Sequence, residues 1–195
     1  MASIKKIKEI YNQELDYLNN ALKNSNNQYH TFSLSTIKNS YPEARTVVLR
    51  NIKQNPSKLY FNSDIRSPKI QELELNNNCT ALFYNNSRKI QLRFKCKAII
   101  HNQNSLCANV WKQTHLQSRK CYMAPYSPSI VLKKWEPNLP IKYLKSDPSQ
   151  IDSELGYKNF SHIELQVLET EILQLHHDGH IRFKKKDSQF IFISS

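Results

Sequence analysis

The chain has 195 residues, which allows one full hydrophobic core and is short for two ordinary domains. Hydrophobic residues make up 39% and charged residues 23%, both within the globular range. No apolar run approaches the roughly 18–20 residues of a membrane-spanning helix, and residues 1–22 lack the apolar core of a secretion signal. The four cysteines form no CxxC pair, so we expect free thiols in a reducing cytoplasm and neither a zinc knuckle nor a redox dithiol.

The net charge of +12 is compatible with three explanations. It suits a polyanion such as nucleic acid, it suits a small molecule that carries a phosphate, and it is also what a surface rich in Lys and Asn would show. The two glycines, Gly156 and Gly179, lie far apart. Dinucleotide-binding and Walker loops need several clustered glycines, so both are excluded, and a bound phosphate would have to be held by side chains.

The first part of the chain alternates between a helix and short strands. Apolar residues at spacings of three and four predict an amphipathic helix over residues 4–23. A second, shorter helix is expected over residues 67–76. Runs with β-branched or alternating residues predict strands at 30–35, 45–51, 58–62, 80–84 and 89–100, the last two joined by a turn at 85–87.

The second part begins with a helical stretch at 104–123 and continues with a loop-like, proline-containing segment at 124–150, which we expect to be mobile. Strand-like runs at 160–174 and 180–192 flank Asp178-Gly179, which is a hairpin signal. No regular βαβ alternation occurs. The sequence therefore predicts a mainly β fold, an antiparallel β-barrel with peripheral helices. We expect a single domain over residues 1–195, with the barrel at about 30–192.

Three segments carry the chemistry. Residues 42–50 read PEARTVVLR, residues 59–69 read LYFNSDIRSPK, and residues 91–93 read QLR. Arginine offers a planar fork to a phosphate and lysine a point charge, while the backbone at a helix start adds a favourable anion site. Arg45 shares a strand face with Leu49, and Arg50 points the opposite way.

These segments resemble the pyridoxamine 5′-phosphate oxidase family and its FMN-binding split-barrel relatives. The resemblance implies a homodimer that binds FMN in a basic cleft between two identical subunits. It implies that the first two segments contact the phosphate and the ribityl chain and that Gln91 contacts the ring. It also implies that Arg119 reaches the phosphate from the partner subunit and that Arg182 lies near the ring. The cofactor-binding residues that we expect are Arg45, Thr46, Val47, Val48, Arg50, Asn62, Ser67, Lys69, Gln91, Ser118, Arg119 and Arg182.

The chain departs from this family near its end. Pyridoxamine phosphate oxidases carry an Arg-Leu-His-Asp-Arg segment there, whereas residues 173–182 read LQLHHDGHIR, and Asn62 stands where the family usually has Thr. The resemblance therefore supports FMN binding better than oxidation of pyridoxamine phosphate. The catalytic residues and the substrate stay open.

The leading hypothesis is an FMN-dependent oxidoreductase that transfers a hydride from its substrate to the flavin. One alternative is a non-catalytic carrier or sensor of a flavin or a heme-like ligand, and a weaker one is a basic nucleic-acid-binding module, which lacks a recognition motif. His176, His177 and His180 cluster around the predicted hairpin. No carboxylate or cysteine set joins them, so we expect no metal site.

Overall fold

The computed structural model describes residues 3–53 and 57–194. Within these residues the chain forms two compact units. Unit 1 comprises the described residues within 1–61, 76–99 and 164–195, and unit 2 comprises residues 62–75 and 100–163. The single domain over residues 1–195 stays a prediction.

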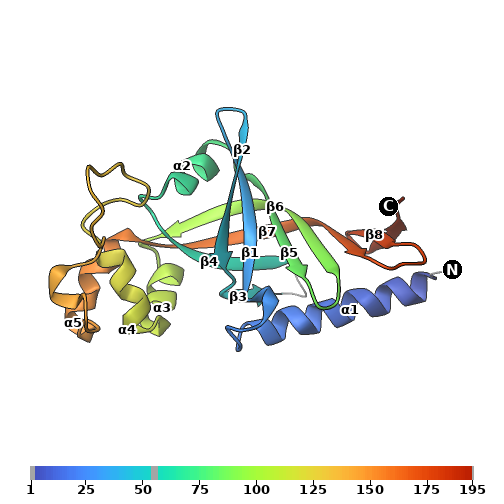
Figure 1. Cartoon of the computed structure of the whole chain (residues 1–195), viewed down its shortest axis with the longest axis horizontal. Helices are drawn as coiled ribbons and strands as arrows, with labels where there is room; N and C mark the ends of the chain where they lie inside the picture. The colour runs from blue at the N-terminus through green and yellow to red at the C-terminus, as the bar shows by residue number, and fades with distance from the viewer. Residues whose placement is uncertain (1–2, 54–56, 195) are drawn as a thin grey trace. The chain divides into compact units, whose positions relative to one another are not determined.

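An antiparallel sheet dominates the described chain (Figure 1), and the predicted mainly β fold is confirmed. Its strands follow the order β2-β1-β5-β6-β7-β4-β3, and β8 pairs with both β7 and β9. Among the described residues, β2 and β3 end this path without pairing with each other, so the sheet is not closed. The strands are β1 Thr31–Lys38, β2 Tyr41–Val48, β3 Asn51–Lys53, β4 Lys58–Asp64, β5 Asn78–Asn85, β6 Ile90–Asn102, β7 Phe160–Gln174, β8 Ile181–Lys186 and β9 Gln189–Phe192.

The helices agree with the predicted ones except in the middle of the chain. The stretch expected at 104–123 is broken, because Thr114 and His115 both adopt extended ψ values of 130° and 143°. The α-helices are α1 Ile4–Ala21, α2 Pro68–Leu75, α3 Ser105–Gln113, α4 Leu116–Arg119 and α5 Gln150–Ser153. Short 3₁₀ helices lie at Gln28–His30, Lys120–Met123, Ile141–Tyr143 and Glu154–Asn159. No helix in the described part of the chain is long and apolar enough to cross a membrane.

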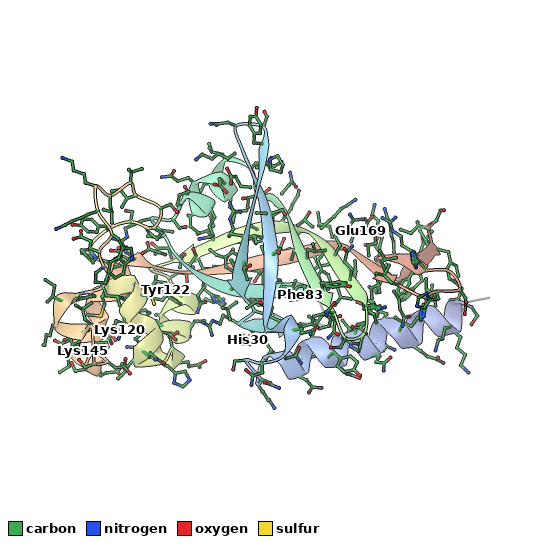
Figure 2. The ribbon with its side chains drawn as sticks, viewed as in Figure 1. His30, Phe83, Lys120, Tyr122, Lys145 and Glu169 are labelled. Carbon is green, nitrogen blue, oxygen red and sulfur yellow. The ribbon has the colours of Figure 1, made fainter. Side chains whose placement is uncertain are left out.

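Unit 1 has an aromatic core. Phe83, which Figure 2 labels, stacks on Phe32 with ring centroids 4.8 Å apart and meets Tyr29 and Phe94 edge to face. Aromatic pairs in these arrangements stabilise beyond the area that they bury. The helix α1 covers this core with its apolar stripe and also packs near β9 (Figure 1), so the predicted amphipathic helix is confirmed.

Helix α1 is also fixed by a buried carboxylate. Glu14 is 1% exposed, accepts a hydrogen bond of 2.7 Å from the Tyr29 hydroxyl, and pairs with both terminal nitrogens of Arg88. The Arg88 guanidinium also lies 3.6 Å from the centroid of the Tyr17 ring. A buried charge is tolerated only when it is paired and hydrogen-bonded, and this network meets both conditions.

Two predicted strands are wrong in their extent, because each is interrupted in the structure. Residues 45–51 were expected as one strand, but β2 ends at Val48 and β3 begins at Asn51. Residues 180–192 divide into β8 and β9 at Asp187, whose φ is 52°. The sequence also missed the hairpin between β1 and β2, which turns at Asn39 and Ser40 with φ values of 48° and 69°.

Unit 2 has its own core. Cys107, Trp111 and Phe160 are buried together, and Tyr122, which Figure 2 labels, packs edge to face on both aromatic rings. Gly156 lies in a 3₁₀ turn against this core, where a β-carbon would stand 3.2 Å from Trp111 and 3.3 Å from the Arg119 carbonyl oxygen. The absence of a side chain at Gly156 lets the turn pack closely on the tryptophan.

Candidate functional site

The start of helix α2 gathers a lysine and two serines in unit 2. Lys69 Nζ donates to the Ser67 hydroxyl at 2.6 Å and to the Ser63 hydroxyl at 3.3 Å. Both serines are buried, at 3% and 6% exposure. By accepting from the ammonium group, the Ser67 hydroxyl keeps its own proton for a further acceptor. A fixed cation beside an oriented hydroxyl is a donor set that suits a phosphate.

The local sequence explains this arrangement. Strand β4 ends at Asp64, whose carboxylate accepts from the Arg66 backbone N–H at 2.9 Å and whose carbonyl accepts from the Ser67 N–H at 3.0 Å. Pro68 then begins α2, the position that proline favours because its ring presets the helical φ. The turn thus brings Ser67 and Lys69 to the helix start, as the sequence predicted.

Arg66 has a structural role beside this cluster. Its guanidinium binds the Asp64 carboxylate with contacts of 3.0 and 2.7 Å and donates to the Ala124 carbonyl at 3.1 Å. The hydrogen bonds that Arg66 donates to the Asp64 carboxylate raise the pKa of Arg66 above its usual range. Since Arg66 and Asp64 neutralise each other, Lys69 supplies the net positive charge of the turn.

The base of the cluster is held by strand β7, which the sequence did not connect with it. The Ser161 hydroxyl donates to the Ser63 carbonyl at 2.7 Å, and His162 Nδ1 lies 2.7 Å from the Asn62 side-chain oxygen. His162 is 4% exposed. The predicted residue Asn62 is therefore held by a buried histidine about 100 residues away, and no local motif indicates that partner.

The structure places Arg119 in the interior of unit 2, at 1% exposure. Its guanidinium donates to Ser153 at 2.9 Å, to Glu154 at 2.8 Å, and to the carbonyls of Thr114 at 3.0 Å and Trp111 at 2.7 Å. This arrangement gives Arg119 a structural role in unit 2, while the phosphate contact across the subunit interface that the resemblance implies for Arg119 stays a prediction. Its predicted neighbour Ser118 is half-buried.

In unit 1, the predicted residues of the β2 segment differ in exposure. Arg45 is half-buried and donates to the Thr36 hydroxyl, to the Leu34 carbonyl at 3.4 Å and to the Glu43 carbonyl at 3.3 Å. Arg50 is exposed, and its backbone N–H donates to the Tyr60 carbonyl at 2.8 Å. The remaining predicted residues are Thr46, which is exposed, Val47, which is buried, and Val48, which is half-buried.

The other two predicted residues of unit 1 lie on β6 and β8. Gln91 is half-buried and faces Tyr84 across the β5–β6 pair. Arg182 donates to the buried Glu171 carboxylate from Nε at 2.9 Å and from Nη2 at 2.7 Å, and Arg93 donates to the same oxygen. A parallel set joins Glu169 to Lys95 at 3.1 Å and to Lys184 at 3.4 Å (Figure 2).

Glu171 gives the stability of unit 1 a defined pH dependence. Burial by itself raises the pKa of Glu171, but hydrogen bonds from Arg93 and Arg182 outweigh burial and hold it below its usual value. Since the folded pKa is the lower one, the unfolded chain binds more protons in the window between the two values. The stabilisation is therefore present above the unfolded pKa, about 4.3, and is lost as the pH falls through the folded pKa.

We expect Glu171→Gln to cost about 1–3 kcal/mol at pH 7, because it leaves two guanidinium groups without a carboxylate. The difference from the parent should shrink toward pH 3, and urea unfolding at a series of pH values measures it. The exposed Glu9→Gln, on α1, is the control. A constant difference across the acid range would contradict this origin of the stability.

The antiparallel order and the flanking helices define a split-barrel protein. A structure of a pyridoxamine 5′-phosphate oxidase-related, FMN-binding protein from Nostoc punctiforme PCC 73102 matches with a TM-score of 0.69 at 17% identity, covering 94% of this chain and 96% of that one. PhzG from Burkholderia lata 383, in complex with tetrahydrophenazine-1-carboxylic acid, matches with a TM-score of 0.67 at 14% identity, covering 92% and 89%. At these identities the likeness concerns the fold alone.

The sequence comparison adds a match to a family over part of the chain. Residues 11–102 match the family described as pyridoxamine 5′-phosphate oxidase, FMN-binding domain. The predicted resemblance to the pyridoxamine 5′-phosphate oxidase-like, FMN-binding split-barrel family is therefore confirmed. No curated protein matches the sequence. Within the described residues, no group of three or more His, Cys, Asp or Glu side chains is arranged to hold a metal ion.

Proposed function

We propose that the protein binds FMN and acts as an FMN-dependent oxidoreductase. The observation that carries this proposal is the cluster of Lys69 with the hydroxyls of Ser63 and Ser67 at the start of α2. It lies inside the residues that match the FMN-binding family. A doubly charged phosphate needs charge-assisted donors, and with two glycines in the chain these must come from side chains.

The residues present fit FMN in their chemistry. Lys69 and Ser67 would bind the phosphate, while the contacts of Arg45 and Arg50 stay what the resemblance implies. Asn62 would bind through its amide, held in place by His162. Gln91 would offer its amide to the ring edge, as the resemblance implies. FMN, when bound, supplies a ring that accepts a hydride, and the protein supplies binding and orientation.

The proposal includes a homodimer with FMN at the interface between the subunits, in the cytoplasm. All four cysteines are free, which suits a reducing compartment. Sedimentation of the purified protein with and without FMN tests the dimer, and we expect twice the mass of the chain. A monomer at all concentrations, saturated with FMN, would contradict the interface site while leaving flavin binding intact.

Flavin binding has a direct test. The purified protein is expected to be yellow or to become so with added FMN, with bound flavin that co-elutes with the protein on gel filtration. Quenching of FMN fluorescence then measures the affinity. A folded, colourless protein that takes up no added FMN would overturn the proposal.

A non-catalytic flavin carrier is the second candidate. It is favoured by Arg182, which stands in the segment that departs from the oxidase family and is bound to Glu171 by two hydrogen bonds. Reduction of the bound flavin under anaerobic conditions separates the two functions. A donor that reduces the flavin with turnover supports the oxidoreductase, whereas stable binding with no reduction by pyridoxamine phosphate or a nicotinamide donor supports the carrier.

A further inference from the structure

Two cysteines that are far apart in the sequence face each other in the sheet of unit 1. Cys79 on β5 and Cys96 on β6 are direct partners in the antiparallel register. Residues that lie directly opposite each other project from the same face of a sheet. Cys79 Sγ lies 3.8 Å from the Cys96 carbonyl oxygen, and the two side chains are 8% and 2% exposed.

The backbone spacing of this pair suits a disulfide. The Ala98 N–H donates to the Asn77 carbonyl at 2.8 Å, two positions along the same ladder. Hydrogen-bonded pairs recur every second residue, so Cys79 and Cys96 form such a pair, for which the Cα atoms are about 5.5 Å apart. Disulfides span Cα separations of about 4.4–6.8 Å. Rotation of the two side chains can therefore join the sulfurs without moving the strands apart.

The pair is reachable by a small molecule. Both cysteines line a pocket of about 320 Å³ in unit 1, together with Thr36, Pro42 and Lys95. Burial raises the pKa of the Cys79 thiol to about 12, so few thiolates form near neutral pH. The reaction is therefore expected to be slow at neutral pH and faster in alkaline solution.

We propose that Cys79 and Cys96 form a reversible cross-strand disulfide by exchange with a low-molecular-weight disulfide. One cysteine thiolate attacks the small disulfide, whose S–S bond breaks, and a mixed disulfide forms with release of one small thiol. The second cysteine then attacks the mixed disulfide and releases the other small thiol. The protein loses two electrons and two protons, and the small disulfide gains both. In a reducing compartment such a bond would be transient and responsive to the redox state.

The experiment uses the full chain with Cys121→Ser, which removes the exposed cysteine. The folded protein is incubated with oxidised glutathione at mildly alkaline pH, and free thiols and non-reduced peptides are analysed by mass spectrometry. We expect the loss of two of the three remaining thiols, a peptide that links Cys79 to Cys96, and full recovery with dithiothreitol. Cys107, buried in unit 2, should stay reduced.

Cys79→Ala in the same background is the matched control, and its folding is checked by circular dichroism. This variant should form no intramolecular link. The proposal is overturned if the folded Cys121→Ser protein keeps all three thiols while the urea-unfolded protein oxidises. It is equally overturned if glutathione adducts accumulate on one cysteine without the link. Neither outcome bears on flavin binding, because only the sulfur chemistry is measured.

Discussion

Replacing Arg119 by Met is expected to lower the free energy of unfolding by about 1–3 kcal/mol, the usual cost of removing the donor from buried hydrogen-bond acceptors. Arg119 is 1% exposed, and its guanidinium satisfies Ser153, Glu154 and two backbone carbonyls. It also stacks on Trp111, with 4.6 Å between the guanidinium carbon and the ring centroid. Methionine fills part of the volume but donates no hydrogen bond, so each of these acceptors would lose the hydrogen bond from Arg119. Urea unfolding of the two proteins measures the difference.

Lys112→Met is the matched control, since Lys112 is an exposed cation in the same unit, and it should change stability by less than about 0.5 kcal/mol. Arg119→Lys should lie between the two variants, because lysine keeps the charge but lacks the planar fork. If Arg119→Met is as stable as the parent but binds FMN more weakly, the contact with FMN implied by the resemblance would replace the structural role.

Replacing Lys69 by Met is expected to weaken FMN binding about 10- to 100-fold. This follows from the loss of a hydrogen bond to a charged group, about 1.5–3 kcal/mol, at 1.4 kcal/mol for each factor of ten. The weakening is expected only for a ligand that carries a phosphate, because Lys69 would direct a cation and Ser67 a hydroxyl toward that group. Fluorescence quenching titrations of both proteins with FMN give the two dissociation constants.

Riboflavin separates a phosphate contact from a general defect, since it carries the same ring without the phosphate. Its affinity should be the same for Lys69→Met and the parent, and Lys112→Met should bind FMN as the parent does. Equal losses for riboflavin and FMN would show that Lys69 supports the fold of the turn and does not bind the phosphate.

Local chemistry explains which elements the sequence could predict. The apolar spacing in α1 was enough to predict that helix, and Asp178-Gly179 was enough to predict the β7–β8 hairpin. Each signal is contained in a short stretch of sequence. The β1–β2 hairpin was missed because Asn39-Ser40 lacks the glycine that normally marks a turn with positive φ. The breaks inside 45–51 and 180–192 were missed because neither contains glycine or proline.

The candidate site was predictable only where its residues are neighbours in the sequence. Ser67 and Lys69 were both expected at a helix start, and the structure joins them there. The support of the neighbouring Ser63 is distant, since Ser161 bonds the Ser63 carbonyl across 98 positions. In unit 1, Glu171 likewise binds Arg93 across 78 positions. The packing of strands decides such pairs, and one sequence without its relatives contains no signal for them.

Scarcity of glycine also has a consequence for resistance to heat. Six described residues other than glycine adopt positive φ, among them Ser40 at 69°, Lys89 at 53° and Asp187 at 52°. For a residue with a β-carbon this conformation costs roughly 1–2 kcal/mol. Replacing such a turn residue by glycine would remove part of this conformational cost from the folded state. The greater freedom of glycine in the unfolded chain would offset some of that gain. A more heat-tolerant form of the protein is therefore within reach through its turns alone, without altering the core or any residue assigned to the flavin.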